Sequence, residues 1–180
     1  DTSACANAFA FDRKTSVLDL ENSTKTDGGA PCYINLDPTG KFVLTANYLG
    51  GTISVIRVEK DGTLSNDRDV IGFRQGPKQA YRRKSHLHTT VFSPDGKYLL
   101  ATDLGKDRLY CSEVNEHAQK ASELLSTTKL SVVDLEIGSG PRHLAFSPNG
   151  KHLYLLSELS GKVNVFDYHD GKIKEVQTLT

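Results

Sequence analysis

The stretch SHLHTTVFSPDGK (residues 85–97) decides the fold of this chain. Two histidines stand before a short apolar run, and a Pro-Asp-Gly turn follows it. The same frame occurs upstream as APCYINLDPTGK (residues 30–41) and downstream as GPRHLAFSPNGK (residues 140–151). The prolines of the three turns are residues 38, 94 and 148, so the frame repeats after 56 and then 54 residues. A repeat near 50 residues is typical of propeller blades or solenoid units.

Each repeat predicts four short strands. In the middle repeat we expect them over Thr90–Ser93, Tyr98–Asp103, Leu109–Val114 and near Leu130–Leu135, with a helical or loop insertion over Glu116–Glu123. Glycine gives the turn between the first two strands its permissive backbone. A parallel β-helix would need a much shorter repeat, and an α-solenoid would need a 3.6-residue periodicity that only residues 114–125 suggest. The sequence therefore predicts an all-β fold, a β-propeller of four-stranded antiparallel blades.

The repeat also predicts the domain organisation. We expect one partial β-propeller domain over residues 1–180, made of the back half of a blade (1–29) and three blades (30–84, 85–139 and 140–180). Propellers usually close with about 4–8 blades, and seven blades of this period would need about 350 residues. An open arc would leave sheet edges unpaired. We therefore expect the remaining blades of a longer polypeptide, or partner segments, to complete the ring.

Composition excludes several classes of protein. The 180 residues carry 22 Lys and Arg against 22 Asp and Glu, and this neutral balance argues against nucleic acid as a partner. No apolar run approaches the roughly 20 residues that span a bilayer, so we expect no membrane partner. Cys5, Cys32 and Cys111 form neither a metal spacing nor a disulfide framework. They favour a reducing compartment, and we expect the cytoplasm. We expect Cys32, at the start of an inner strand, to be buried packing.

The propeller topology gathers polar residues on one face of the disc. Residues before the first strand of a blade and after its second strand share that face, close to the central channel. The three repeats place there Asn47 and Tyr48; His86, His88, Asp103 and Asp107; and Arg142, His143, Ser157 and Glu158. The repeated Pro-Gly turns lie on the opposite face and need only a structural interpretation.

A histidine, an arginine and a glutamate at one channel mouth could perform acyl chemistry. Histidine transfers protons near neutral pH, and arginine holds an anionic group or stabilises an oxyanion. Glutamate can orient the histidine or polarise a water molecule. No serine or cysteine stands in a nucleophile-elbow context, so water is the expected nucleophile. We expect neither a metal nor another cofactor, because nothing completes a tetrahedral set around His86 and His88.

Simpler interpretations stand beside these. A single histidine before a strand is more often a loop hydrogen-bonding residue than a catalyst. Asp103 and Asp107 can satisfy turn amides. The basic run is a solvated loop or a contact for an anionic substrate, and it comprises Lys78, Arg82, Arg83 and Lys84.

Four motifs in order and at blade spacing resemble a known family. They are RRKSHLH (residues 82–88), TDLGKDR (102–108), GPRH (140–143) and SEL (157–159), and ANY (46–48) also fits. The chain resembles the seven-bladed propeller lactonases, which include propeller-type 6-phosphogluconolactonases and fungal carboxy-cis,cis-muconate cyclases. The resemblance covers nearly all 180 residues, but only about half of a typical member.

The resemblance implies a metal-independent site at one channel mouth. The catalytic positions of the cyclase branch fall on His88, Arg142 and Glu158. A further arginine of the family belongs to a later blade and has no counterpart here. We expect the substrate to contact His86, Asn47, Asp103, His143 and Arg83, of which Arg83 stands where the family often has glutamine.

The implied reaction is hydrolysis of 6-phosphogluconolactone, an anionic lactone, to 6-phosphogluconate in the pentose phosphate pathway. His88 or Glu158 would activate water, while Arg142 would stabilise the oxyanion or hold an anionic group. Two alternatives stay open: a muconate-type lactonising cyclase, and a non-catalytic propeller that binds a partner on the same face. A third is a redox propeller carrying a quinone or metal.

Overall fold

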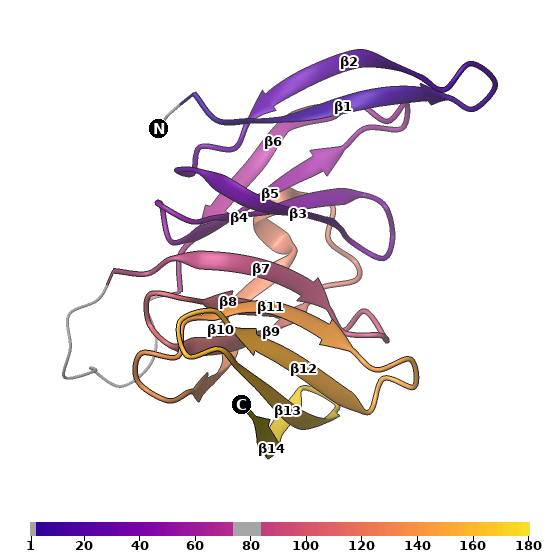
Figure 1. Ribbon diagram of the computed structural model, residues 1–180. Helices are drawn as coiled ribbons and strands as arrows, with labels where there is room; N and C mark the ends of the chain where they lie inside the picture. The colour runs from indigo at the N-terminus through magenta and orange to yellow at the C-terminus, as the bar shows by residue number, and fades with distance from the viewer. Residues whose placement is uncertain (1–2, 74–83) are drawn as a thin grey trace.

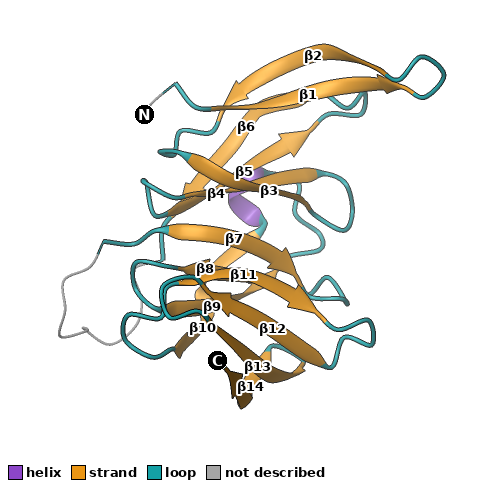
Figure 2. Cartoon of the chain, in the orientation of Figure 1, coloured by secondary structure: helices purple, strands orange, loops and turns teal. Residues whose placement is uncertain are grey.

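The chain folds into three four-stranded antiparallel sheets and one two-stranded hairpin, shown in a computed structural model that describes residues 3–73 and 84–180 (Figures 1 and 2). The sheets are stacked side by side, each twisted like a propeller blade. This arrangement confirms the all-β propeller fold predicted from the repeat. The blade boundaries predicted after residues 29, 84 and 139 stay a prediction.

Strands follow the chain order within each sheet. The hairpin consists of β1 (Cys5–Asp12) and β2 (Val17–Lys25). The first full sheet consists of β3 (Pro31–Leu36), β4 (Phe42–Asn47), β5 (Thr52–Val58) and β6 (Leu64–Ile71). The second consists of β7 (Leu87–Phe92), β8 (Tyr98–Asp103), β9 (Arg108–Val114) and β10 (Leu125–Asp134). The third consists of β11 (Pro141–Phe146), β12 (His152–Ser157), β13 (Lys162–His169) and β14 (Lys172–Leu179).

The middle sheet differs from its prediction at two places. Its second strand matches Tyr98–Asp103, but its first strand begins at Leu87 rather than Thr90, which places His88 inside the strand. Its fourth strand begins earlier than expected, at Leu125. The predicted insertion before that strand is confirmed, and it contains one short 3₁₀ helix, η1 (Ala121–Glu123).

Apolar residues at successive strand positions fill the two spaces between neighbouring sheets. Leu99 of β8 packs with Phe42 and Leu44 of the first sheet, while the next residue, Leu100, packs with Leu153 and other residues of the third sheet. Successive side chains of a strand point to opposite faces, so the middle sheet supplies both cores. This double burial explains the two consecutive buried leucines in the middle of β8.

The inner strands β3, β7 and β11 lie next to one another, with β7 in contact with both of the others (Figure 1). The turns that follow these strands stack in the same way. A Cβ atom added to Gly96 would lie 3.2 Å from Cγ of Pro38, and one added to Gly150 would lie 3.1 Å from Cγ of Pro94. Both glycines have positive φ angles, 73° and 70°. The repeated turns therefore join blades on the face opposite the predicted site.

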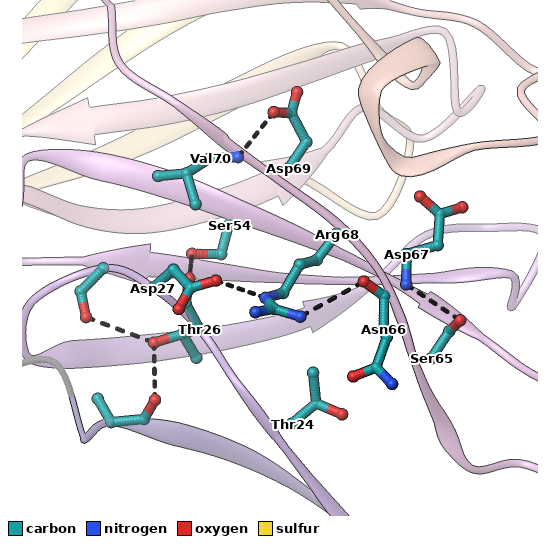
Figure 3. Close-up of polar contacts among 12 residues, drawn as sticks. Thr24, Thr26, Asp27, Ser54, Ser65, Asn66, Asp67, Arg68, Asp69 and Val70 are labelled. Carbon is teal, nitrogen blue, oxygen red and sulfur yellow. Dashed lines mark hydrogen bonds and ion pairs between the residues drawn. The ribbon is translucent and has the colours of Figure 1, made fainter.

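Polar contacts attach the β1–β2 hairpin segment to the first full sheet. Nδ2 of Asn22 donates to the carbonyl oxygen of Leu64 at 2.8 Å, and the backbone N–H of Leu64 donates back to Oδ1 of Asn22 at 3.0 Å. Figure 3 shows the neighbouring contacts, in which Arg68 of β6 pairs with Asp27. These bonds continue the side-by-side arrangement of sheets beyond β6.

Within residues 3–73 and 84–180, no helix has the length and apolar character needed to cross a membrane.

Candidate active site

A β-bulge occurs at the same position in all three inner strands. In β7, Leu87 pairs with Asp103 and Thr89 with Thr102, so His88 is left unpaired. In β11, Arg142 is skipped in the same way between Pro141 and His143. In β3 the skipped residue is Cys32. A bulge re-aims the side chain of its extra residue. The repeat thus presents Cys32, His88 and Arg142 at equivalent positions of adjacent blades.

The structure brings His88, Arg142 and Glu158 together across two blades. The Nε–H of Arg142 donates to Nε2 of His88 at 3.0 Å. The same Nε atom lies 2.8 Å from Oε2 of Glu158, which follows β12. The guanidinium group is therefore held between an imidazole and a carboxylate. The predicted trio is one contiguous cluster, and its catalytic role stays a prediction.

Burial separates the histidine from the other two members of this cluster. His88 is 8% exposed, whereas the side chains of Arg142 and Glu158 are 40% and 46% exposed. Burial lowers the pKa of His88 below its ordinary value of 6.5, and the nearby positive charge of Arg142 and the His143 ring lower it further. His88 is consequently neutral at pH 7, with a lone pair on Nε2 that accepts the Arg142 N–H.

Aromatic rings extend the cluster over three blades. The ring of Tyr48 stacks on His86 with centroids 4.5 Å apart, and Nδ1 of His86 lies 2.9 Å from the carbonyl oxygen of Tyr48. Tyr48 also meets His88 edge-on at 5.8 Å, and His88 meets the exposed His143 at 5.3 Å. His86 and His143, both predicted to bind substrate, therefore flank the trio. Their binding role stays a prediction.

Asn47 and Asp103, also predicted to bind substrate, are fully buried. Nδ2 of Asn47 donates to Oγ of Ser54 at 2.8 Å. The carboxylate of Asp103 accepts the backbone N–H of His86 at 2.8 Å and that of Lys106 at 3.0 Å. Asp103 thus satisfies loop amides, as the simpler interpretation of the sequence proposed. Contact between these two side chains and substrate stays a prediction.

Arg83 lies outside the described residues, as do Lys78 and Arg82 of the same basic run. Lys84, the last residue of that run, is exposed.

Cys32 corrects one prediction from the sequence. It was expected to be buried packing, but it is exposed. Its Sγ lies 3.3 Å from the carbonyl oxygen of His88. Partial burial raises the pKa of its thiol, and the positive charge of Arg142 opposes that rise. Aligning the three repeats position by position would have placed Cys32 beside the His88 and Arg142 cluster, because Cys32 is the equivalent of His88 in the preceding blade.

Asp107 satisfies loop amides, as the simpler interpretation of the sequence proposed, and the structure shows which loop it holds. Its carboxylate accepts the backbone N–H groups of Gly138 and Gly140 at 2.9 and 2.8 Å, which belong to the loop that leads into β11. A residue of the second blade therefore fixes the segment that carries Arg142.

One cavity of the described region lies away from this cluster. It measures about 620 Å³ and opens between turns on the opposite face, with Pro38, Gly96 and Tyr98 in its wall. Within the described residues, no group of three or more His, Cys, Asp or Glu side chains is arranged to hold a metal ion.

Fold and site together define a class: a β-propeller in which a histidine and an arginine on bulged inner strands meet a glutamate that follows a second strand, at one face. Within that class, the chain belongs to the family described as Lactonase, 7-bladed beta-propeller, whose family model matches residues 1–180.

Similar proteins carry lactonase names. The 6-phosphogluconolactonase of Bacillus subtilis is 32% identical over 176 residues, which cover 96% of this chain and 48% of that protein. A solved structure from Bacteroides uniformis is 44% identical with a TM-score of 0.86, covering 100% of this chain and 51% of the other. The periplasmic gluconolactonase of Pseudomonas aeruginosa is 32% identical with a TM-score of 0.81, covering 99% and 50%. The chain thus spans about half the length of the relatives it matches.

Proposed function

We propose that the whole protein hydrolyses 6-phosphogluconolactone to 6-phosphogluconate by attack of water, without a metal ion. The observation that carries this proposal is the contact of Arg142 with both His88 and Glu158 in a chain of the lactonase family. Relatives named 6-phosphogluconolactonase and gluconolactonase support a lactone as substrate. We further propose that the protein works in the cytoplasm, in keeping with its three free cysteines.

The chemistry of lactone hydrolysis assigns a task to each group. A base removes a proton from water while the water oxygen bonds to the lactone carbonyl carbon, and the carbonyl oxygen gains negative charge. The tetrahedral intermediate then expels the ring oxygen, which takes up a proton and becomes a hydroxyl group. Either His88 or Glu158 is the base, and Arg142 stabilises the oxyanion or holds an anionic group of the substrate.

Arg142 is suited to that task because only its Nε–H is directed at His88. Within the described part of the chain, its terminal amino groups are left as donors, and guanidinium donors match a carboxylate, a phosphate or an oxyanion. The half-exposed carboxylate of Glu158 keeps the cation in place.

The test is lactone hydrolysis by the natural gene product, with wild type and Arg142→Ala compared after subtraction of the spontaneous rate. We expect wild-type turnover and a loss of about 100- to 1,000-fold in the variant, the usual effect of removing an oxyanion donor. No wild-type rate above background with 6-phosphogluconolactone would overturn the proposal. Turnover of a muconate or its lactone instead would identify the protein as a cyclase.

A further inference from the structure

The position of the His88 ring conflicts with a direct role in proton transfer. Its Nε2 atom already accepts the Nε–H of Arg142 at 3.0 Å. Its Nδ1 atom is enclosed by protein atoms and, within the described residues, has no hydrogen-bond partner beyond its own backbone. A general base must reach the proton that it removes, directly or through one water molecule. Neither nitrogen of this ring meets that condition.

Glu158 meets the condition that His88 does not. Its carboxylate is 46% exposed and pairs with Arg142 through Oε2, which leaves Oε1 as a proton acceptor. Because both His88 and Glu158 touch the same Nε atom, the histidine fixes the guanidinium from the buried side and the carboxylate fixes it from the open side.

We infer that His88 is a positioning residue, which orients Arg142 through a hydrogen bond to Nε2, and that Glu158 is the base that activates water. This inference rests on the proposed lactonase function for the role of Glu158. The role of His88 rests on the geometry alone. The inference requires His88 to be the neutral tautomer with its proton on Nδ1, because an Nε2 that carries a proton could not accept from Arg142.

The tautomer gives a test that does not depend on activity. Nitrogen-15 NMR of the histidine rings in the wild-type whole protein, with the His88 signals identified from their loss in His88→Gln, should show a protonated Nδ1 and an unprotonated Nε2 at pH 7.5. A neutral ring with its proton on Nε2 would overturn the inference, even if the protein proves not to be a lactonase.

Activity gives the second test, through two substitutions at one position. The amide oxygen of glutamine can occupy the place of Nε2 and accept the Arg142 N–H, whereas alanine cannot. We expect His88→Gln to keep kcat within about 10-fold of wild type and to keep its pH profile. We expect His88→Ala to lose about 100-fold, and Glu158→Gln to lose about 100- to 10,000-fold as expected for a general base.

The pH profile separates positioning from catalysis. Among the described residues, the titratable or charged groups next to His88 are Arg142, His143, Tyr48 and Cys32, with Glu158 beyond Arg142. If His88→Gln lost as much activity as Glu158→Gln and also lost the acidic limb of kcat/KM, then His88 would be the base and the inference would be wrong. Melting temperatures of both His88 variants identify any loss caused by unfolding. A wild type that hydrolyses no lactone would overturn the role of Glu158 and leave the tautomer test to decide on His88.

Discussion

The carboxylate of Asp107 accepts the backbone N–H of Gly140 at 2.8 Å, and this bond joins the second blade to the third. A second bond to Gly138 and a contact with Oγ of Ser139 hold the same loop. Asp107 is fully buried, and Arg142 follows the loop by two residues. The position of Arg142 thus depends on an aspartate from the neighbouring blade.

Asp107→Ala should therefore lower both stability and activity. Removal of the carboxylate leaves the buried N–H of Gly140 and the part-buried N–H of Gly138 without their acceptor. Hydrogen bonds to a charged group contribute about 1.5–3 kcal/mol each to the free energy of unfolding. We expect a loss of that order in denaturant unfolding and a fall in kcat larger than the change in KM. Asp107→Asn, which keeps one oxygen acceptor, is the matched control. Its stability and its kcat should lie between those of wild type and Asp107→Ala. Unchanged kcat in a destabilised Asp107→Ala would show that the loop does not position Arg142.

His88 should make the folded protein less stable in mild acid. Burial, with Arg142 and His143, holds its pKa in the folded state below the ordinary 6.5, so the unfolded chain binds a proton more readily. The contribution of His88 is complete above pH 6.5 and is lost as the pH falls through the lower folded pKa. An NMR titration of the ring should give a midpoint below 6.5. His88→Gln should lack this part of the acid dependence, and an equal dependence in both proteins would contradict the assignment.

The three cysteines should react with a thiol reagent at different rates. Cys5 is exposed. Cys32 is an exposed residue, but partial burial of its Sγ raises the pKa of its thiol, and full burial raises the pKa of Cys111 to about 11. Because the thiolate is the reactive species, we expect Cys5 to react first at pH 8, Cys32 more slowly and Cys111 only on unfolding. A reagent that releases a coloured group on reaction lets absorbance follow the three phases, one for each cysteine.

Two substitutions check this order. Cys32→Ser should remove the second phase, and Arg142→Ala should slow it, because the arginine charge lowers the pKa of the Cys32 thiol. Fast labelling of Cys111 in the folded protein would contradict the structure.

A side chain at Gly105 should disturb the candidate active site, because Gly105 packs against the segment that carries His86. A Cβ atom there would lie 1.9 Å from the carbonyl oxygen of Lys84 and 2.7 Å from the His86 ring. Gly105→Ala should therefore displace the segment that leads into β7 and lower kcat/KM by about 10-fold or more, an effect of about 1.4 kcal/mol. Gly72→Ala is the control, because among the described residues its Cβ atom would meet Thr52 alone, at 3.8 Å. Equal activity of the two variants would contradict this prediction.

Much of the fold was predictable because the sequence repeats. The turn around Pro94 and the strand Tyr98–Asp103 were both located from the recurring frame. The start of β7 was not, because a bulge adds a residue without changing the apolar pattern that predicts a strand. The length of β10 was also missed, since its polar residues give no alternating pattern.

The sequence predicted which residues lie at the candidate site, but it did not predict their contacts or their burial. The topology and the family resemblance placed His88, Arg142 and Glu158 on one face, and the structure brings them into contact. That face also contained Asn47 and Asp103, which turn out to be buried. A sequence does not show burial of a single polar residue, because burial depends on which neighbouring loop closes over it.

The sequence by itself determined the blade, its period and the residue types at the channel face, because strand alternation and turn chemistry are local properties of the chain. Only the tertiary structure decided which of those residues contact one another. The Arg142 N–H reaches a histidine 54 residues away, and Asp107 anchors the loop of the next blade. Such contacts depend on the stacking of one blade on another, which no local pattern encodes.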